Sequence, residues 1–376
     1  MNIALISVAP PYRGGISEHT KGLYKQLNQK HAVRIFTFYY QYPKLFFPGT
    51  KQIGNQEYNC ENTDYCISSI NPFSWGKTVN KVLNFNPDLV IFTYWNPYFS
   101  PCFGFIARRL KTKIGDSKLI SIFHNIIPHE KSILNNFLFK YYIKPFQKCM
   151  FMSSFVKNQL NTFKKSVKSS IRFLPIKKDY KIKFNKNDLR DEIEMKADDQ
   201  IILFFGLIRK YKGLDILLEA VGKYFKSNSK SKLIIAGEAY EDRKRYLKII
   251  NQLNIKDKII WLNEFISNEK IEKLMTLSDL LVLPYHFASQ SGVLSQAWQY
   301  EIPSIVTDVG GLPEYVDDEK SGYIIKNNNS NALAQKIEYF FESESSLKMK
   351  EYIRLNKNKF SWENHIEGIW ELTDES

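Results

Sequence analysis

The sequence contains few cysteines. The four in a chain of 376 residues, Cys60, Cys66, Cys102 and Cys149, form neither a CxxC pair nor the spacing of a zinc site. This usage argues against a disulfide framework and fits a reducing compartment.

Long apolar runs are also missing. No stretch of about 18 consecutive apolar residues occurs, and the best candidate, residues 88–109, is broken by Asn96, Pro97 and Pro101. The chain enters a strand-like stretch directly after Met1, without the basic region or cleavage site of a signal peptide. We therefore expect a cytoplasmic protein, either soluble or peripheral on the inner face of the plasma membrane.

Length and charge give the next constraints. With 376 residues, 44% of them hydrophobic and 15% aromatic, the chain is long and apolar enough for two globular domains. Residues 1–180 hold 25 Lys and Arg against 8 Asp and Glu, whereas residues 181–376 hold 28 against 31. A basic half facing an anionic partner, such as nucleic acid, anionic lipid or a phosphorylated acceptor, is one interpretation, and a plain solubility surface is the other.

Strand-like and helix-like patterns alternate along the chain. This alternation predicts an α/β protein of two doubly wound, Rossmann-like domains with parallel sheets. The hinge is expected in the polar stretch 177–200. The predicted strands are 2–8, 32–38, 88–95, 119–123, 149–153, 201–205, 233–236, 259–262, 280–283 and 303–307, and the predicted helices are 17–28, 214–226, 242–253, 268–277, 292–300, 331–342 and 361–373.

The stretch 201–213 is the most informative motif. An apolar strand ends at Gly206, Arg209 and Lys212 follow within six residues, and a helical pattern begins at Leu214. A strand, a short cationic loop and a helix start together bind phosphate, because the helix offers unpaired N–H groups and the cations add full charges. A loop whose cations only meet solvent is the alternative.

Other strand ends in the first half carry candidate ligand groups. Gly14 and Gly15 stand before the first helix, where backbone N–H groups can approach an anion, although an ordinary tight turn also fits. His124 directly follows a buried strand, where it either contacts a ligand in the cleft between the domains or is structural. A metal site with His129 and Glu130 is disfavoured, because these residues share no helix face with His124.

The second half repeats the pattern at its strand ends. Because ligands of open parallel sheets bind beyond the carboxyl ends of the strands, this concentration of glycine and polar residues indicates a nucleotide site. The groups are Gly237 and Glu238, Glu264, the run Gln290, Ser291, Gly292 and Val293, and residues 308–314.

The ordered motifs resemble glycosyltransferase family 4. They are Gly14-Gly15, residues 124–130 (HNxxPHE), Gly206 with Arg209 and Lys212, Gly237-Glu238, QSGV at 290–293 and residues 308–314, joined by a QYPxxxFPG segment at 41–49 and by residues 360–363 near the end. The likeness spans nearly the whole chain. It implies the GT-B fold, with an acceptor domain at 1–178 that is completed by a helix at about 360–376, and a nucleotide-sugar domain at 179–359.

The resemblance also implies chemistry for individual residues. Arg209 and Lys212 match the cations that bind the donor diphosphate and stabilise the leaving nucleotide, so that no metal and no cofactor is needed. His124 matches the histidine that contacts the donor sugar, and together these three are the expected catalytic residues. The expected donor-binding residues are Gly14, Gly15, Gly206, Gly237, Glu238, Glu264, Gln290, Ser291, Gly292 and Val293.

The implied activity is the retaining transfer of a sugar from a UDP- or GDP-type nucleotide sugar to a glycan or lipid-linked acceptor in bacterial surface polysaccharide synthesis. The chain departs from the family because its usual glutamate pair, eight positions apart, is missing, and no carboxylate lies between Asp279 and Glu301. Other "QSG" sequences share this trait, which we interpret as a feature of that branch. A catalytically silent GT-B protein, an epimerase of related fold and a nucleic-acid binder are the alternatives, and the last lacks any recognised binding motif.

The segment 131–148 combines lysines and aromatic residues. Lys140, Lys144 and Lys148 recur every four residues, so that one face of a helix could rest on anionic lipid. A helix packed into the domain, with Pro145 in its last turn, is the alternative interpretation.

Overall fold

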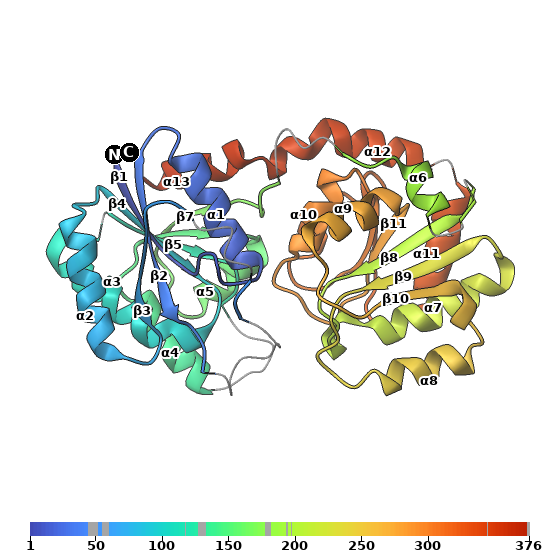
Figure 1. Ribbon diagram of the computed structural model, residues 1–376, viewed down its shortest axis with the longest axis horizontal. Coiled ribbons are helices and arrows are strands. Elements are labelled where there is room, and N and C mark those ends of the chain that lie inside the picture. The colour runs from blue at the N-terminus through green and yellow to red at the C-terminus, as the bar shows by residue number, and fades with distance from the viewer. Residues whose placement is uncertain are drawn as a thin grey trace. The chain divides into compact units, whose positions relative to one another are not determined.

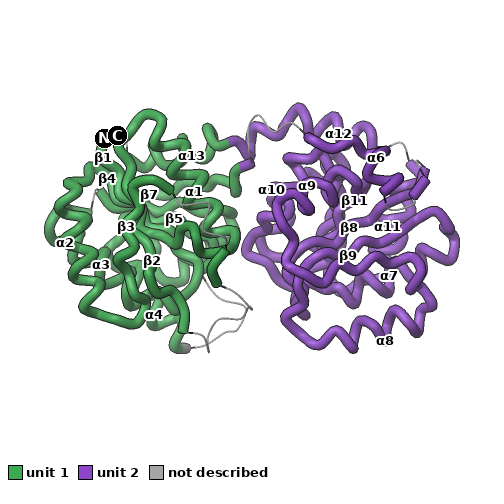
Figure 2. Tube along the Cα trace, viewed as in Figure 1, with its two compact units in different colours: residues 1–175, 362–376 green, residues 176–361 purple. Residues whose placement is uncertain are grey.

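The computed structural model describes residues 1–43, 52–54, 60–116, 118–126, 133–176, 182–192, 195–196, 198–343 and 345–373. The chain divides into two compact units (Figure 2). The N-terminal unit comprises Met1–Pro175 together with Trp362–Ser376, and the C-terminal unit comprises Ile176–Ser361. Each unit is built on one parallel sheet.

The N-terminal unit contains a seven-stranded sheet in the order β3-β2-β1-β4-β5-β6-β7 (Figure 1). Its strands are β1 (Asn2–Ile6), β2 (Ala32–Tyr40), β3 (Thr63–Ser68), β4 (Leu89–Tyr94), β5 (Leu119–Phe123), β6 (Lys148–Phe151) and β7 (Lys168–Ile171). Its helices are α1 (Gly15–Leu27), α2 (Pro72–Asn84), the short η3 (Pro97–Phe99), α3 (Ser100–Ile114), α4 (Ile133–Ile143), α5 (Ser154–Asn161) and α13 (Trp362–Thr373).

Two apolar cores cover the two faces of this sheet. Along β1 the side chains alternate, as the pleat of a strand requires. Ile3 and Leu5 join a core with α1 and the terminal helix α13. Ala4 and Ile6 join a core with α2, α3, α4 and α5. The strand is therefore apolar from Ile3 to Ile6, because both of its faces are buried there.

The C-terminal unit contains a six-stranded sheet in the order β10-β9-β8-β11-β12-β13. Its strands are β8 (Gln200–Phe205), β9 (Ser231–Ala236), β10 (Ile259–Leu262), β11 (Leu280–Leu283), β12 (Ser304–Thr307) and β13 (Gly322–Ile325). Its helices are α6 (Lys186–Asp191), η4 (Lys210–Lys212), α7 (Leu214–Ser227), α8 (Lys244–Gln252), η5 (Lys256–Lys258), α9 (Asn268–Leu277), α10 (Gly292–Gln299), η6 (Pro313–Tyr315), α11 (Ser330–Glu342), α12 (Ser345–Asn356) and η7 (Lys357–Phe360).

The predicted fold class is confirmed. Both sheets are parallel, and strands β5, β10 and β11 and helix α9 have the predicted bounds. Strands β3, β7 and β13 and helices α2, α3, α5, α6 and α12 were not predicted. Within the polar stretch 177–200, the structure places helix α6 and the first residue of β8; residues 177–181 lie outside the described part.

The prediction of a lysine face on one helix is wrong. Helix α4 ends at Ile143, Lys144 lies in the following turn, and Lys148 begins β6. Pro145 explains the stop, because proline cannot donate a backbone hydrogen bond and disfavours helical geometry in the residue before it. Three aromatic residues of this segment, Phe139, Tyr142 and Phe146, are buried in the core of the sheet, as the packed-helix interpretation requires.

Among the described residues, no helix combines the length and the apolar character needed to cross a bilayer.

A glycine lets the start of α7 approach the end of β11 in the C-terminal unit. Gly213, between η4 and α7, has a φ of 66°, and a Cβ atom built on it would lie 2.0 Å from the carbonyl oxygen of Pro284. Pro284 directly follows β11. The start of α7 can therefore approach β11 only because this position carries no side chain.

We expect Gly213→Ala to destabilise the C-terminal unit by about 1–3 kcal/mol, because alanine is strained at this φ and its methyl group meets backbone. The control is Gly76→Ala in α2, where an added Cβ meets no atom within 4 Å. That change should be neutral or stabilise the protein by up to about 1 kcal/mol, because alanine favours helix. Calorimetric unfolding of both variants measures the difference. Equal melting temperatures for the two variants would contradict the contact.

Candidate functional site

The strand order reverses at one place in each sheet. In the N-terminal unit this switch lies between β1 and β4, and in the C-terminal unit it lies between β8 and β11. In doubly wound sheets the loops that leave such neighbouring strands diverge to opposite faces and open a crevice at their carboxyl ends. The predicted site residues nearest to these switches are Gly14 and Gly15 after β1, and Gly206 and Lys212 after β8.

Lys212 is held at the switch of the C-terminal unit. Its Nζ donates a hydrogen bond to the hydroxyl of Tyr285, 3.0 Å away, and Tyr285 follows the end of β11. A Cβ atom on Gly206 would lie 2.9 Å from this Nζ and 3.7 Å from Val293 Cγ2. The amine therefore lies between the end of β8, the end of β11 and the first turn of α10.

Two helices begin at this place. Helix α7 starts at Leu214, directly after Lys212 and Gly213, and α10 starts at Gly292. The side chain of Ser291 does not cap α10 and is instead bonded to the hydroxyl of Tyr285. The first N–H groups of a helix lack intrahelical partners and carry partial positive charge, so that both helix starts favour an anion.

The two cations differ in their environments. Burial lowers the pKa of Lys212, and the neighbouring Arg209 lowers it further, because both disfavour an additional positive charge. The guanidinium of Arg209 lies 5.2 Å from the ring centre of Tyr240. An anion bound here would stabilise the charged form of Lys212. This cluster thus has the chemistry of an anion site.

Three further predicted residues of the C-terminal unit follow strands: Gly237 and Glu238 follow β9, and Glu264 follows β10. Gly237 directly follows β9 with a φ of 145°, and a Cβ on it would lie 2.1 Å from the carbonyl oxygen of Gly206, so the two strand ends touch through backbone. The carbonyl of Glu238 accepts a hydrogen bond from the N–H of Ile208. Glu264 has a half-exposed carboxylate that pairs with Lys270.

Two glutamines lie near the start of α10: Gln290 precedes the helix, and Gln296 is its fifth residue. The amide oxygens of Gln290 and Gln296 are buried and have no hydrogen-bond partner within the described part of the chain. Gln290 was a predicted site residue, whereas Gln296 was noted only as occupying the region of the missing glutamates. A buried amide without partners can satisfy hydroxyl groups of a ligand.

The paired glycines of the N-terminal unit leave backbone accessible. Gly14 precedes α1 with a φ of 116°, and Gly15 is the first residue of that helix. A Cβ atom on either glycine would meet no atom of the described residues within 4 Å. The N–H groups of this turn are therefore open to a ligand from the side of the glycines.

His124 lies at the end of β5, and its ring is buried with 2% exposure. The ring packs against His19 of α1 with centroids 4.7 Å apart and planes at 80°. Burial lowers the pKa of His124 to about 3, and nearby His365 adds to the effect, so the ring is neutral at pH 7. Sequence reasoning missed His19 and His365 because no motif connects them to residue 124. His129 and Glu130 lie outside the described residues, as do residues 44–49 of the QYPxxxFPG segment.

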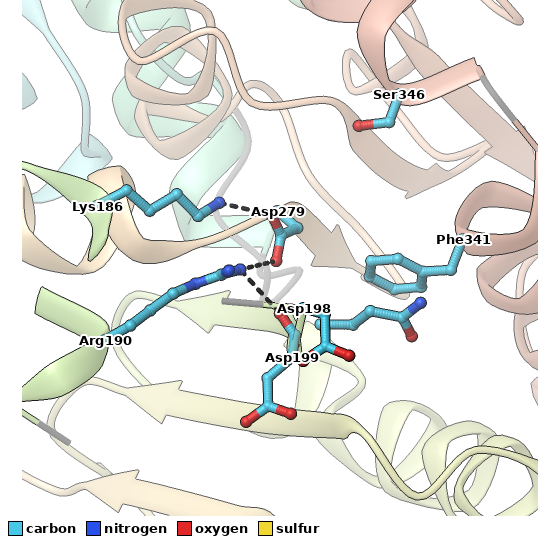
Figure 3. A pocket seen from close by; sticks show the side chains of 8 residues that line it. Lys186, Arg190, Asp198, Asp199, Asp279, Phe341 and Ser346 are labelled. Carbon is cyan, nitrogen blue, oxygen red and sulfur yellow. Dashed lines mark hydrogen bonds and ion pairs between the residues drawn. The ribbon is translucent and has the colours of Figure 1, made fainter. Parts of the chain in front are cut away.

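A polar pocket of about 250 Å³ lies at the opposite edge of the C-terminal sheet, since Gln200 begins β8 and Asp279 precedes β11. Lys186 and Arg190 of α6 point to Asp279, whose Oδ atoms they contact at 2.5 Å and 3.2 Å (Figure 3). These paired charges fasten α6 to the sheet. We therefore assign the pocket a structural role.

The described residues include no group of three or more His, Cys, Asp and Glu side chains arranged to hold a metal ion.

Comparison with known proteins shows which sequences the chain is similar to. Residues 185–360 match the family described as Glycosyl transferases group 1. An uncharacterized glycosyltransferase of Methanocaldococcus jannaschii is 24% identical over 383 residues, which cover 100% of this chain and 98% of the relative. A second one from that organism is 29% identical over 185 residues, 48% of this chain and 46% of the relative. The chain spans about half the length, or less, of most curated relatives that it matches.

Solved structures agree in fold. The structure of Anabaena HepE in complex with UDP has a TM-score of 0.74 and 15% sequence identity, and the alignment covers 98% of each chain. The fold is GT-B, and the comparisons support a glycosyltransferase enzyme.

The buried histidines predict a pH dependence of stability. The pKa is lowered to about 3 for His124, to about 4 for His365 and well below its usual value for His19, in each case chiefly by burial. The unfolded chain, with histidine pKa values near 6.5, binds protons that the folded protein does not. The contribution of these histidines to the free energy of unfolding is therefore fully present above about pH 6.5. It decreases as the pH falls below that value.

We expect each buried histidine to contribute a slope of up to about 1.4 kcal/mol per pH unit between about pH 6 and 5. Urea unfolding at pH 7, 6 and 5 measures the total slope. Replacement of one titrating group in His365→Gln should make the slope shallower, and an unchanged slope would show that this histidine is not buried in the neutral form.

Proposed function

We propose that the protein is a retaining, metal-independent glycosyltransferase that moves a sugar from a nucleotide-diphosphate sugar to a glycan or lipid-linked acceptor in bacterial surface polysaccharide synthesis. The observation that carries this proposal is the position of Lys212. Its amine is held at the carboxyl edge of the sheet in the unit that matches the group 1 transferases, beside two helix starts.

The donor diphosphate would bind at this cluster. Lys212 and Arg209 supply two positive charges, and the first turns of α7 and α10 supply N–H groups. As the bond between sugar and diphosphate breaks, negative charge grows on the leaving nucleotide. Preorganised cations stabilise that charge more strongly in the transition state than in the bound substrate, which is the role a metal ion has in other transferases. The UDP complex of the structural neighbour HepE supports a nucleotide sugar as donor.

The ribose would be held by amides instead of a carboxylate. No Asp or Glu lies between Asp279 and Glu301, and the buried amide oxygens of Gln290 and Gln296 stand at the start of α10 without partners among the described residues. Each oxygen can accept a hydrogen bond from a hydroxyl group. A neutral acceptor also avoids placing a buried negative charge near the phosphates.

The N-terminal unit would receive the acceptor and contact anionic lipid. Residues 1–180 carry the excess of Lys and Arg. On α4, Leu134 and Phe137 are 62% and 68% exposed, and they lie three positions apart, which places them on one side of the helix beside exposed Lys140. Exposed apolar side chains next to lysine are typical of a helix that rests on a membrane surface.

A catalytically silent GT-B protein is the second candidate. The missing glutamates favour it, because such a protein would bind nucleotide sugar or a partner transferase without turnover. Thermal-shift screening against UDP, GDP and their sugars, followed by transfer and nucleotide-release assays on the ligands that bind, separates the two functions. Binding without release in the wild-type protein would favour the silent protein.

We expect Lys212→Ala and Arg209→Ala each to lower kcat by about 10²–10³-fold, because each removes one preorganised charge from the leaving diphosphate. Lys210→Ala, in the same loop but exposed, is the matched control and should stay within about twofold of the wild type. Nucleotide release from the preferred donor measures turnover. Near-normal turnover of Lys212→Ala would refute the assigned role.

We expect Leu134→Ser combined with Phe137→Ser to weaken binding to vesicles of phosphatidylglycerol and phosphatidylcholine by about tenfold or more, because two apolar side chains leave the lipid interface. The control, Leu347→Ser with Leu355→Ser, changes two equally exposed leucines of α12 in the other unit. Flotation assays measure the bound fraction. Equal losses for the two pairs would argue against α4 as the contact.

A further inference from the structure

Three buried histidines from distant parts of the sequence meet in the N-terminal unit. His19 lies on α1, His124 follows β5, and His365 lies on the terminal helix α13. Their exposures are 5%, 2% and 1%. The ring centroid of His19 lies 4.7 Å from that of His124 and 4.9 Å from that of His365. His19 therefore stands between the terminal helix and the histidine that follows β5.

The hydrogen bonds in this cluster determine which nitrogen carries each proton. Nδ1 of His365 lies 3.0 Å from the carbonyl oxygen of Phe173, and a carbonyl only accepts, so Nδ1 carries the proton. Nε2 of the neutral His365 ring then has a lone pair. It lies 2.9 Å from Nε2 of His19, which must therefore be the donor. Nδ1 of His19 is left with a lone pair, buried and without a partner within the described residues.

This assignment requires neutral rings. Burial lowers the pKa of all three histidines. His124 and His365 lower the pKa of His19 further, and His365 lowers that of His124. The charged side chain that acts on His365 is Arg172, which lowers the pKa further and is itself paired with Glu371. The cluster is therefore a chain of neutral imidazoles at pH 7.

Helix α13 fixes the ring of His19 from a second side. Trp362 stacks on this ring with centroids 5.7 Å apart, and a Cβ atom on Gly22 of α1 would lie 2.1 Å from the indole. The indole thus occupies a notch in α1. Two further bonds hold α13 to the end of β7, from Ser170 Oγ to the carbonyl of Gly368 and from Arg172 Nε to the carbonyl of Asn364.

We propose that His365 and His19 are positioning residues for His124. The terminal helix sets the protonated nitrogen of His19, and the ring of His19, held by Trp362 and His365, fixes the orientation of the His124 ring through their edge-to-face contact. This inference rests on the proposed role of His124 as the residue that contacts the donor sugar. Neither His19 nor His365 need touch the substrate, so their loss should affect turnover through His124 alone.

The test compares two replacements of one side chain. His365→Gln keeps an acceptor for His19 Nε2–H and a donor for the carbonyl of Phe173, whereas His365→Phe keeps a ring and loses both bonds. Nitrogen-15 NMR of the imidazoles reports the protonated nitrogen of each histidine without any need for activity. Nucleotide-release kinetics report kcat and KM for the donor. His124→Ala gives the reference effect, which should fall on kcat more than on KM.

We expect the wild type to show His365 protonated at Nδ1 and His19 at Nε2. His365→Phe should give His19 a mixture of both tautomers and lower kcat by about tenfold or more with KM within about twofold, as loss of a supporting residue does elsewhere. His365→Gln should restore both readouts to near the wild type. The control is His31→Ala, because His31 contacts α13 through Trp370, with centroids 5.2 Å apart, but lies outside the cluster of three histidines. It should leave kcat and the tautomers unchanged.

The outcomes distinguish a failure of the proposed function from a failure of the positioning role. A wild type with the assigned tautomers but no turnover with any nucleotide sugar overturns the proposed function and the positioning role that rests on it, and leaves only the hydrogen-bond assignment. Turnover that is equal in His365→Phe and the wild type, with His124→Ala impaired, overturns the positioning role alone. If His365→Phe does not fold, His365→Gln and Gly22→Ala decide the question, since the second displaces Trp362 and leaves all three histidines in place. Unchanged kcat in Gly22→Ala would then count against the proposal.

Discussion

The contact of backbone with backbone at the carboxyl edge of the C-terminal sheet is the constraint on which the candidate site depends. At Gly213 and Gly237 the next strand end approaches so closely that a single methyl group would collide with a carbonyl oxygen. This contact brings the ends of β8, β9 and β11 together and leaves a narrow place for the amine of Lys212 beside Tyr285. The charge of the site is thus positioned by the main chain, which is more rigid than any arrangement of long side chains.

Much of this architecture could be predicted from the sequence. Strands β5, β10 and β11 are short apolar runs, and their bounds were predicted correctly. β5 and β11 lie inside their parallel sheets and are buried along their whole length, which explains the continuous apolar run. Strand β3 was missed because its residues are mixed in polarity and only its second half is buried. Helix α4 was predicted too long, since a spacing of four between lysines looks helical even where Pro145 ends the helix.

Some residues of the candidate site could likewise be predicted from the sequence, and others could not. Arg209, Lys212 and the glycines could be predicted because each follows a strand, and position after a strand is visible in the sequence. The partners of His124 could not be predicted. His19 and His365 are 346 positions apart, and a hydrogen bond between two imidazoles leaves no periodicity and no motif. Only the packing of α13 against α1 brings them together.

The chain path of the N-terminal unit has a consequence for its synthesis. One face of its sheet is completed by α13, whose residues come after the entire C-terminal unit in the sequence. A ribosome therefore releases residues 1–175 long before the helix that covers Leu5, Leu23 and Ile122 exists. During that interval an apolar face is unprotected, and because exposed apolar surface on a nascent chain promotes aggregation, this face is a natural place for a chaperone to bind. The C-terminal unit, whose residues are contiguous, can finish folding first.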